Sequence, residues 1–206
     1  MTRRPIVLGI DFDNTIVGYD ALFHRVAREL NVIPATVAAN KNAVRDHLNS
    51  TGQKDVFTEM QGTVYGARMA GAEACPGVIE SLTTFARAGV PFFIISHKTR
   101  TPIIGTKHDL HAAARGWLEL QGFFDPGRVG LAAERVFFEL TKEAKLDRIA
   151  ACACTHFIDD LPEILFHPDF PHGVERILYD PTGHATTPRP CRRLTSWQML
   201  PELLHS

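Results

Sequence analysis

Two aspartates stand directly after an apolar stretch near the start of the chain. Residues Leu8 to Thr15 read LGIDFDNT, so one residue separates Asp11 from Asp13. Residues i and i+2 of an extended chain project to the same side, and two carboxylates this close repel each other. A divalent cation, or a proton shared between them, relieves that repulsion. The pair therefore predicts metal or acid–base chemistry, whereas the alternative is two aspartates that only cap a turn.

Polar side chains also follow other apolar runs of the sequence. The run PFFIIS ends on Ser96, and the run THFID leads into Asp159 and Asp160. Between these runs, the segment TKEAK carries Lys142 in the first turn of a predicted helix. Ligands of open parallel sheets bind beyond the carboxyl ends of the strands, so we expect these groups to meet at one edge of a sheet. The alternatives without a catalytic role are that Ser96 only closes a strand and that Asp160 only caps a helix.

A second lysine, Lys145, lies one helical turn after Lys142 and competes with it for the site. Leu146 and Ile149 mark the apolar face of the predicted helix. On this face geometry we expect Lys142 at the mouth of the helix, near the polar groups, and Lys145 in solvent.

These groups together support phosphoryl transfer through a covalent aspartyl phosphate. A carboxylate nucleophile can approach phosphorus only after the charge of the phosphoryl group has been neutralised. Mg²⁺ held by oxygen ligands, with Lys142 and the hydroxyl of Ser96, would supply that neutralisation. The second carboxyl group, Asp13, can protonate the leaving alcohol and later accept a proton from the attacking water.

The elements that must position these groups alternate between strand-like and helix-like patterns. Such alternation, with strands that are apolar on both faces, predicts an α/β fold with a Rossmann-like parallel sheet flanked by helices. The helix 142–151 has Thr141 as its predicted N-cap. The predicted strands are 5–10, 91–96, 135–139, 155–159 and 175–180.

One stretch, residues 17–75, interrupts the alternation because it shows helical patterns and no strand. An all-helical insertion directly after the first strand is expected to form a cap over the active end of the sheet. We therefore expect an α/β core made of residues 1–16 and 76–206, with a helical cap over 17–75. Within the cap, Gln61, Tyr65 and Arg68 have the spacing of one helical face, which predicts either a substrate-facing surface or a packing seam. His97 and Lys98, next to Ser96, are further candidates for contact with substrate.

The bulk composition excludes several classes of function. The 206 residues carry a net charge of −1, without a basic stripe that would favour nucleic acid or an anionic membrane. No run approaches the ~20 apolar residues of a membrane-spanning helix, so we expect a soluble, cytoplasmic protein. The 4 cysteines are too few and too irregular to predict a disulfide framework or a zinc site.

The sequence DFDNT, then IIS, then a helix-opening lysine and then FIDD resembles the four ordered motifs of the haloacid dehalogenase-like (HAD) superfamily. The resemblance spans nearly the whole chain. It implies Asp11 as the nucleophile, Asp13 as the general acid and base, Ser96 as a phosphate binder and Lys142 as a charge clamp.

The resemblance also implies a Mg²⁺ site formed by Asp11, the backbone carbonyl of Asp13 and Asp159. Asp160 would position the lysine or a metal-bound water, and Thr15 would hold the loop. The expected activity is hydrolysis of a small phosphate monoester, such as a sugar phosphate or a nucleotide. The alternatives are a dehalogenase of the same superfamily, which has no leaving alcohol to protonate, and a non-catalytic binding or regulatory protein that keeps the fold.

Overall fold

The computed structural model describes residues 5–205, and these residues form two compact units. The chain passes between the two units four times. The sheet unit contains the chain up to Ile16, the segment Ala74–Lys98 and the chain from Gly122 onwards, and the helical unit contains Val17–Glu73 and Thr99–Gln121.

The expected boundaries differ from this division in two places: residues 74–75 belong to the sheet unit, and residues 99–121 belong to the helical unit. This segment contains helix α5 (Leu110–Leu120), which was expected in the α/β core. The buried indole of Trp117 donates a hydrogen bond of 3.0 Å to the backbone carbonyl of Ala72. The unit against which α5 packs depends on long-range contacts of this kind, which the sequence alone does not reveal.

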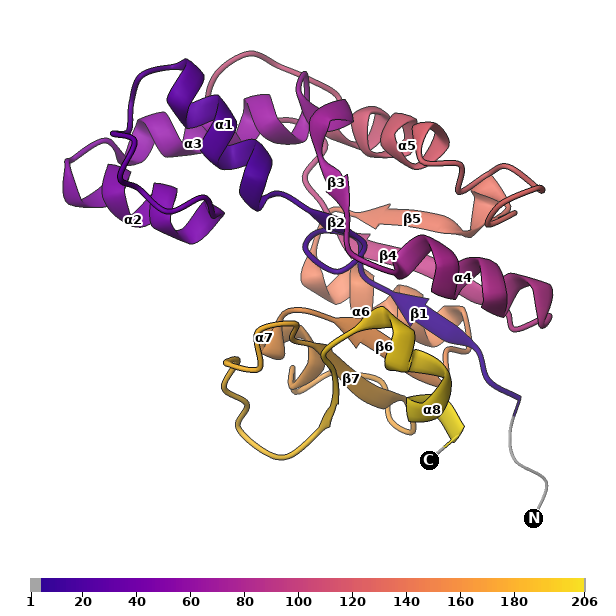
Figure 1. Ribbon diagram of the computed structural model, residues 1–206. Coiled ribbons are helices and arrows are strands. Elements are labelled where there is room, and N and C mark those ends of the chain that lie inside the picture. The colour runs from indigo at the N-terminus through magenta and orange to yellow at the C-terminus, as the bar shows by residue number, and fades with distance from the viewer. Residues whose placement is uncertain (1–4, 206) are drawn as a thin grey trace. The chain divides into compact units, whose positions relative to one another are not determined.

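A six-stranded parallel sheet forms the centre of the sheet unit, in the order β5-β4-β1-β6-β7-β8 (Figure 1). All five pairs of neighbouring strands are parallel, so the Rossmann-like α/β fold is confirmed. The last of these strands follows the loop after residue 180 and was not predicted. The strands are β1 (Leu8–Ile10), β4 (Phe92–His97), β5 (Val136–Glu139), β6 (His156–Asp159), β7 (Glu175–Tyr179) and β8 (Arg192–Leu194).

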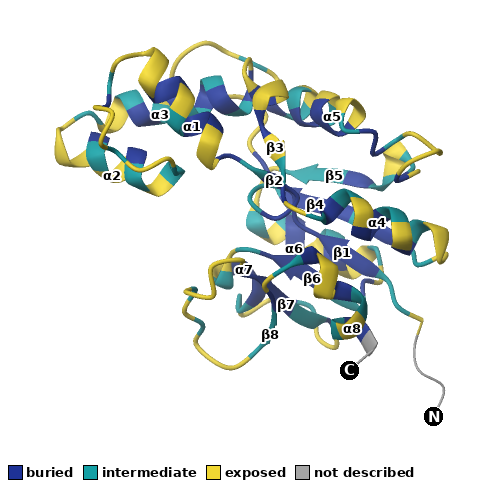
Figure 2. Ribbon diagram, viewed as in Figure 1, coloured by how far each residue is buried: buried dark blue, intermediate teal, exposed yellow. Residues whose placement is uncertain are grey.

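Two helices, α6 (Lys142–Ala151) and α7 (Pro162–Leu165), pack against one face of the sheet through apolar side chains. Ile95, Phe157 and Leu178, from three strands, belong to the buried cluster that includes the apolar side chains of both helices. The hydroxyl of the α6 N-cap, Thr141, accepts a hydrogen bond from the helix backbone, as its position in the sequence predicts. Figure 2 shows the strands as mostly buried, which agrees with their apolar sequences.

Helix α4 (Val78–Arg87) is linked to the C-terminal part of the chain, which ends in α8 (Leu200–His205). The hydroxyl of Ser81 donates to the carbonyl of Trp197 at 2.9 Å. The indole of the same tryptophan donates to the carbonyl of Thr15 at 3.1 Å, and both residues are buried. These bonds tie the loop after β1 to elements distant in the sequence.

The helical unit is built around aromatic side chains. The ring of Phe23 stacks on that of Phe57 and lies edge-on to that of Tyr65. No helix within residues 5–205 is long and apolar enough to cross a membrane. Besides α5, the unit contains α1 (Asp20–Glu29), α2 (Lys41–Ser50) and α3 (Lys54–Tyr65), and the short strands β2 (Val17–Gly18) and β3 (Glu73–Ala74) pair with each other at its edge.

Candidate active site

Asp11 and Asp159 lie at the carboxyl ends of two neighbouring strands. Ile10, the last residue of β1, is paired in register with Ile158 of β6. The backbone N–H of Asp11 continues this pairing, because it donates to the carbonyl of Ile158 at 2.8 Å. Parallel pairing therefore places two buried carboxylates side by side at one edge of the sheet.

Strand β4 brings Ser96 to the same edge from the other side of β1. Ile94 of β4 is paired with Ile10 of β1, and Ser96 lies two residues further along β4. Its buried hydroxyl donates a hydrogen bond of 2.9 Å to Oδ1 of Asp11. The structure thus brings together the predicted hydroxyl and the first predicted carboxylate.

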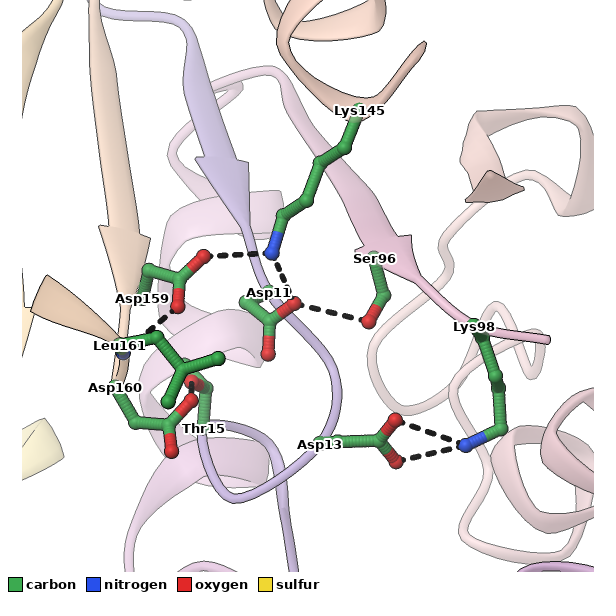
Figure 3. A network of polar contacts seen from close by, with 9 residues as sticks. All are labelled: Asp11, Asp13, Thr15, Ser96, Lys98, Lys145, Asp159, Asp160 and Leu161. Carbon is green, nitrogen blue, oxygen red and sulfur yellow. Dashed lines mark hydrogen bonds and ion pairs between the residues drawn. The ribbon is translucent and has the colours of Figure 1, made fainter. Parts of the chain in front are cut away.

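The lysine of this cluster is Lys145 and not Lys142, so the prediction for the two lysines is wrong. The ammonium of Lys145 is buried and lies 2.6 Å from Oδ1 of Asp11 and 2.6 Å from Oδ2 of Asp159 (Figure 3). Lys142 is the first residue of α6 and pairs with Glu163 of α7 at 2.9 Å, where both side chains are exposed.

Lys145 is buried, against the prediction, because a lysine can occupy the buried face of a helix when carboxylates lie close enough to bind its ammonium. Lys145 lies next to Leu146 and one turn before Ile149, and all three residues are buried. Its aliphatic stem extends along the apolar face, so that the charge reaches the strand ends. Hydrophobic periodicity classes lysine as an exposed residue and therefore does not find it.

Burial and charge act in opposite directions on the groups of this cluster. Burial alone would lower the pKa of Lys145, but the carboxylates of Asp11 and Asp159 outweigh it and hold the pKa above its usual value. Burial raises the pKa of Asp159 to about 7, although the ammonium of Lys145 opposes this shift. Burial, together with the charges of Asp11 and Asp159, raises the pKa of Asp160 well above its usual range. One ammonium therefore cannot balance three ionised carboxylates, and the folded state favours a bound proton or cation at this cluster.

Asp160 and Thr15 lie beside the buried cluster. The hydroxyl of Thr15 is 3.5 Å from Oδ1 of Asp160, at the outer limit for a hydrogen bond. Oδ1 of Asp159 accepts a hydrogen bond of 2.9 Å from the backbone N–H of Leu161 (Figure 3). The turn after β6 thereby fixes the orientation of the Asp159 carboxylate.

Asp13 is on the loop after β1, and its carboxylate is turned toward Lys98. The ammonium of Lys98 donates to both oxygens of Asp13, each at 2.9 Å. The next residue, Asn14, has a φ of 59°, a left-handed conformation that asparagine adopts more readily than most residues. The sequence suggested Lys98 as a contact for substrate, but it did not reveal this ion pair.

The side chains that meet at this edge fit a hard divalent cation. One oxygen from each of Asp11, Asp159 and Asp160 lies within 4.8 Å of the other two. All three donors are carboxylate oxygens, which Mg²⁺ prefers over the nitrogen or sulfur ligands of zinc or copper sites. The carboxylate of Asp13 is not one of these three donors, and it is bound to Lys98 instead.

Two of the three predicted cap residues line a cavity of about 90 Å³ within the helical unit. Gln61 and Tyr65 border it from α3, and Thr99 borders it from the segment that precedes α5. Arg68 is not part of this lining, because α3 ends at Tyr65 and the spacing of one helical face is lost. Its exposed guanidinium instead donates to both oxygens of Glu29.

Packing within the helical unit explains the glycines that accompany these residues. A Cβ atom at Gly62 would lie 2.8 Å from Cβ of Pro102, and one at Gly66 would lie 2.7 Å from Cβ of His108. Both glycines therefore allow the segment before α5 to pack tightly on α3. The remaining predicted contact, His97, is a half-buried residue of β4 and is paired in register with Glu139 of β5.

Several solved structures of HAD hydrolases are similar to this chain in fold. No protein-family model matches the sequence, and no curated protein matches it significantly. A HAD family hydrolase from Deinococcus radiodurans R1 with bound phosphate and sodium is 18% identical, with a TM-score of 0.61 over 97% of this chain and 95% of that one.

Two further structures are similar over nearly the whole length. A HAD hydrolase from Bacillus subtilis bound to magnesium is 15% identical, with a TM-score of 0.62 over 99% of this chain and 100% of that one. A dehalogenase is 12% identical, with a TM-score of 0.58 over 100% of both chains. At these identities the likeness establishes the fold, and the chain has the fold of HAD-superfamily hydrolases, as the resemblance of its motifs implies.

Proposed function

We propose that the protein is a Mg²⁺-dependent phosphatase that hydrolyses a small phosphate monoester through a phosphorylated Asp11. The observation that carries this proposal is the buried cluster at the strand ends, where Asp11 is held by Ser96 and Lys145 beside two further carboxylates. The fold of the HAD hydrolases agrees with the proposal but does not identify the reaction.

The charge of the cluster supports the metal assignment. When ionised, Asp11, Asp159 and Asp160 carry three negative charges, which Lys145 reduces to two. A divalent cation balances this excess, and these three residues would hold it, with the backbone carbonyl of Asp13 as a further ligand implied by the motif. When bound, the cation would neutralise the oxygens of the phosphoryl group and lower the repulsion that Asp11 meets.

The residues of the chain divide the remaining chemistry between them. Ser96 and Lys145 both donate to Oδ1 of Asp11. Within the part of the chain that the structure describes, Oδ2 therefore remains available to an electrophile or a metal ion. In the first step a carboxylate oxygen of Asp11 bonds to phosphorus, the bond to the leaving oxygen breaks, and Asp13 gives that oxygen a proton. In the second step water attacks phosphorus, Asp13 accepts the proton of the water, and inorganic phosphate and free Asp11 result.

Lys145 and Ser96 stabilise the charge that develops in both steps. Lys145 offers a buried ammonium and Ser96 a buried hydroxyl next to the attacking carboxylate. Groups fixed before the reaction need no reorganisation during it, and they act more strongly away from water. We therefore assign the role of charge clamp to Lys145 instead of Lys142.

For the substrate we propose a small phosphorylated metabolite rather than a nucleic acid or a protein. The net charge of −1 provides no excess of basic side chains for a polyanion. The helical unit would select the leaving group through Gln61 and Tyr65, which border the cavity in that unit.

Two alternatives are less well supported. A dehalogenase shares the fold and also uses an aspartate nucleophile, but it has no leaving alcohol to protonate, and here Asp13 is present and held by an ion pair. A non-catalytic protein should lack at least one essential group, whereas the nucleophile, second carboxyl, hydroxyl, lysine and acidic pair are all present.

The test is a panel of phosphate monoesters and haloacids, each incubated with purified protein and Mg²⁺. We expect release of phosphate from at least one ester and no release of halide. The variant Asp11→Asn should lose at least ~10³-fold in turnover, as is typical when a nucleophile is removed. Halide release without phosphate release would favour the dehalogenase, and equal residual rates in the wild type and the variant would favour the non-catalytic protein.

A further inference from the structure

We propose that Lys98 is a positioning residue that holds the Asp13 carboxylate outside the metal site, where it remains available for proton transfer. This inference rests on the proposed phosphatase chemistry, but it concerns a residue that is not part of the acidic cluster. The observation behind it is the ion pair between Lys98 and Asp13.

The geometry of the ion pair fixes the orientation of the carboxylate. The ammonium of Lys98 is 2.9 Å from Oδ1 and 2.9 Å from Oδ2 of Asp13, so both oxygens are bound by one nitrogen. Rotation of the carboxylate toward the cluster would break both hydrogen bonds. Charge-assisted hydrogen bonds are stronger than neutral ones, and this pair is partly shielded from water.

Lys98 is itself firmly placed. Its backbone N–H donates to the carbonyl of Glu139 at 2.8 Å, which extends the pairing of β4 with β5 by one residue. Its side chain is only 4% exposed, and the ammonium lies 5.6 Å from the centre of the Phe12 ring. A lysine held at its backbone and along its stem can act as a fixed point for a neighbouring loop.

Asp13 needs such a fixed point more than the other carboxylates do. It belongs to the irregular loop after β1, and its side chain is 25% exposed, whereas that of Asp11 is 6% exposed. Its charge interacts unfavourably with that of Asp160 and favourably with the ammonium of Lys98. Figure 3 shows that the Asp13 side chain points toward Lys98 and away from the group formed by Asp11, Lys145 and Asp159.

Without Lys98, a metal ion at the acidic cluster would attract the Asp13 carboxylate. A carboxylate bound to the metal cannot exchange a proton with the leaving group or with water. The function inferred for Lys98 is therefore to keep Asp13 separate from the three carboxylates that hold the cation.

The kinetic test compares the wild type with Lys98→Met and Lys98→Arg on two kinds of ester. The leaving group of p-nitrophenyl phosphate departs without a proton, whereas that of an alkyl phosphate needs one. We expect Lys98→Met to lose at least ~10-fold more in kcat/KM on the alkyl ester than on the aryl ester, since general acid catalysis contributes about 10²–10⁴-fold. Lys98→Arg should recover most of this difference.

A matched control is Arg148→Met, which removes a partly buried ion pair with Glu139 in the same unit and does not touch Asp13. This variant should leave the ratio of alkyl to aryl activity unchanged. Equal losses on both esters in Lys98→Met would overturn the inference, because they would indicate a role in phosphate binding or in folding. If Lys98→Met does not fold, Lys98→Gln replaces it and is judged by the same ratio.

A crystallographic comparison separates this inference from the proposed function. Crystals of the wild type and of Lys98→Met, both soaked with Mg²⁺, should show the Asp13 carboxylate displaced only in the variant. An unchanged position in the variant would contradict the role of Lys98, whatever the activity. A wild type that hydrolyses no phosphate monoester of the panel would defeat the phosphatase proposal, and the position of Asp13 would still decide the role of Lys98.

Discussion

The ammonium of Lys145 lies 2.6 Å from Oδ1 of Asp11, and both side chains are buried at the carboxyl edge of the sheet. A charge in such a place is stable only when opposite charges surround it. Lys145 meets this condition through Asp11 and through Asp159, the last residue of β6. The contact therefore joins helix α6 to the predicted nucleophile.

The first prediction compares the two lysines of α6. Lys145→Met should lower kcat by about 10²–10³-fold, since it removes the positive charge next to the attacking carboxylate. Lys142→Met should retain activity within about a factor of three, because exposed ion pairs such as that with Glu163 contribute little. Steady-state rates with p-nitrophenyl phosphate measure both effects.

Thermal unfolding of the same variants provides the control. Lys145→Met leaves the carboxylates of Asp11 and Asp159 without their cation, so it should unfold at a lower temperature than the wild type when Mg²⁺ is absent. A large loss of activity in Lys142→Met, with little effect of Lys145→Met, would restore the assignment favoured by the sequence.

The second prediction concerns the metal. A chelator should abolish turnover, and Ca²⁺ should inhibit, because the larger ion takes more oxygen ligands at longer distances and disturbs the placement of Asp11. Asp160→Asn should raise the Mg²⁺ concentration needed for half-maximal rate by about 10- to 100-fold, as expected when a supporting carboxylate is lost. Full activity in excess chelator would refute the metal assignment.

The third prediction is a dependence of stability on pH in the metal-free protein. Asp159 and Asp160 bind a proton more tightly in the folded state, since burial raises the pKa of Asp159 to about 7 and that of Asp160 well above its usual range. Between about pH 4 and pH 7, the folded state therefore binds more protons than the unfolded state. The free energy of unfolding should then fall as the pH rises through this window.

Thermal melts in chelator at several pH values measure this effect. Mg²⁺ should stabilise the protein more at pH 8 than at pH 5, because the cation takes the place of the protons. Asp160→Asn, which cannot ionise at this position, should flatten the pH dependence without Mg²⁺. A metal-free protein whose melting temperature rises steadily from pH 5 to pH 8 would contradict this electrostatic description.

The fourth prediction concerns substrate selection by the helical unit. Gln61→Ala and Tyr65→Phe should change the KM, or the rank order of substrates, by several-fold, while kcat for p-nitrophenyl phosphate stays close to that of the wild type. Arg68→Ala is the matched control, because its guanidinium is exposed and bound to Glu29. If only the Arg68 variant changed the preference, the substrate-facing residues would have been assigned wrongly.

The sequence was sufficient to predict most strands of the sheet, because these strands form nearly continuous apolar runs. Strands β1, β4, β5, β6 and β7 all lie within the predicted runs or within one residue of them. Strand β8 was missed because its sequence, RRL, has three residues, and two of them are arginines. The place of residues 99–121 in the helical unit was also beyond prediction, since the bond between Trp117 and Ala72 joins residues far apart in the sequence.

For the candidate site, the sequence was most informative about residues at or directly after the carboxyl ends of strands. Asp11, Ser96 and Asp159 were found in this way, because parallel pairing brings strand ends together. Lys145 and the partner of Asp13 were not found, because their placement depends on which charges lie across the fold. A helical lysine is read as exposed until the carboxylates that compensate its burial are known.

The most direct test of the central proposal is detection of phosphate on Asp11. The protein would be mixed with Mg²⁺ and its best phosphate ester, quenched in acid within a single turnover, digested and analysed by mass spectrometry. We predict that the peptide containing Asp11 gains the mass of one phosphoryl group, and that Asp11→Asn shows no such gain. Turnover of the ester with no phosphorylated peptide in the wild type, or with the phosphoryl group on another residue, would contradict the proposed mechanism.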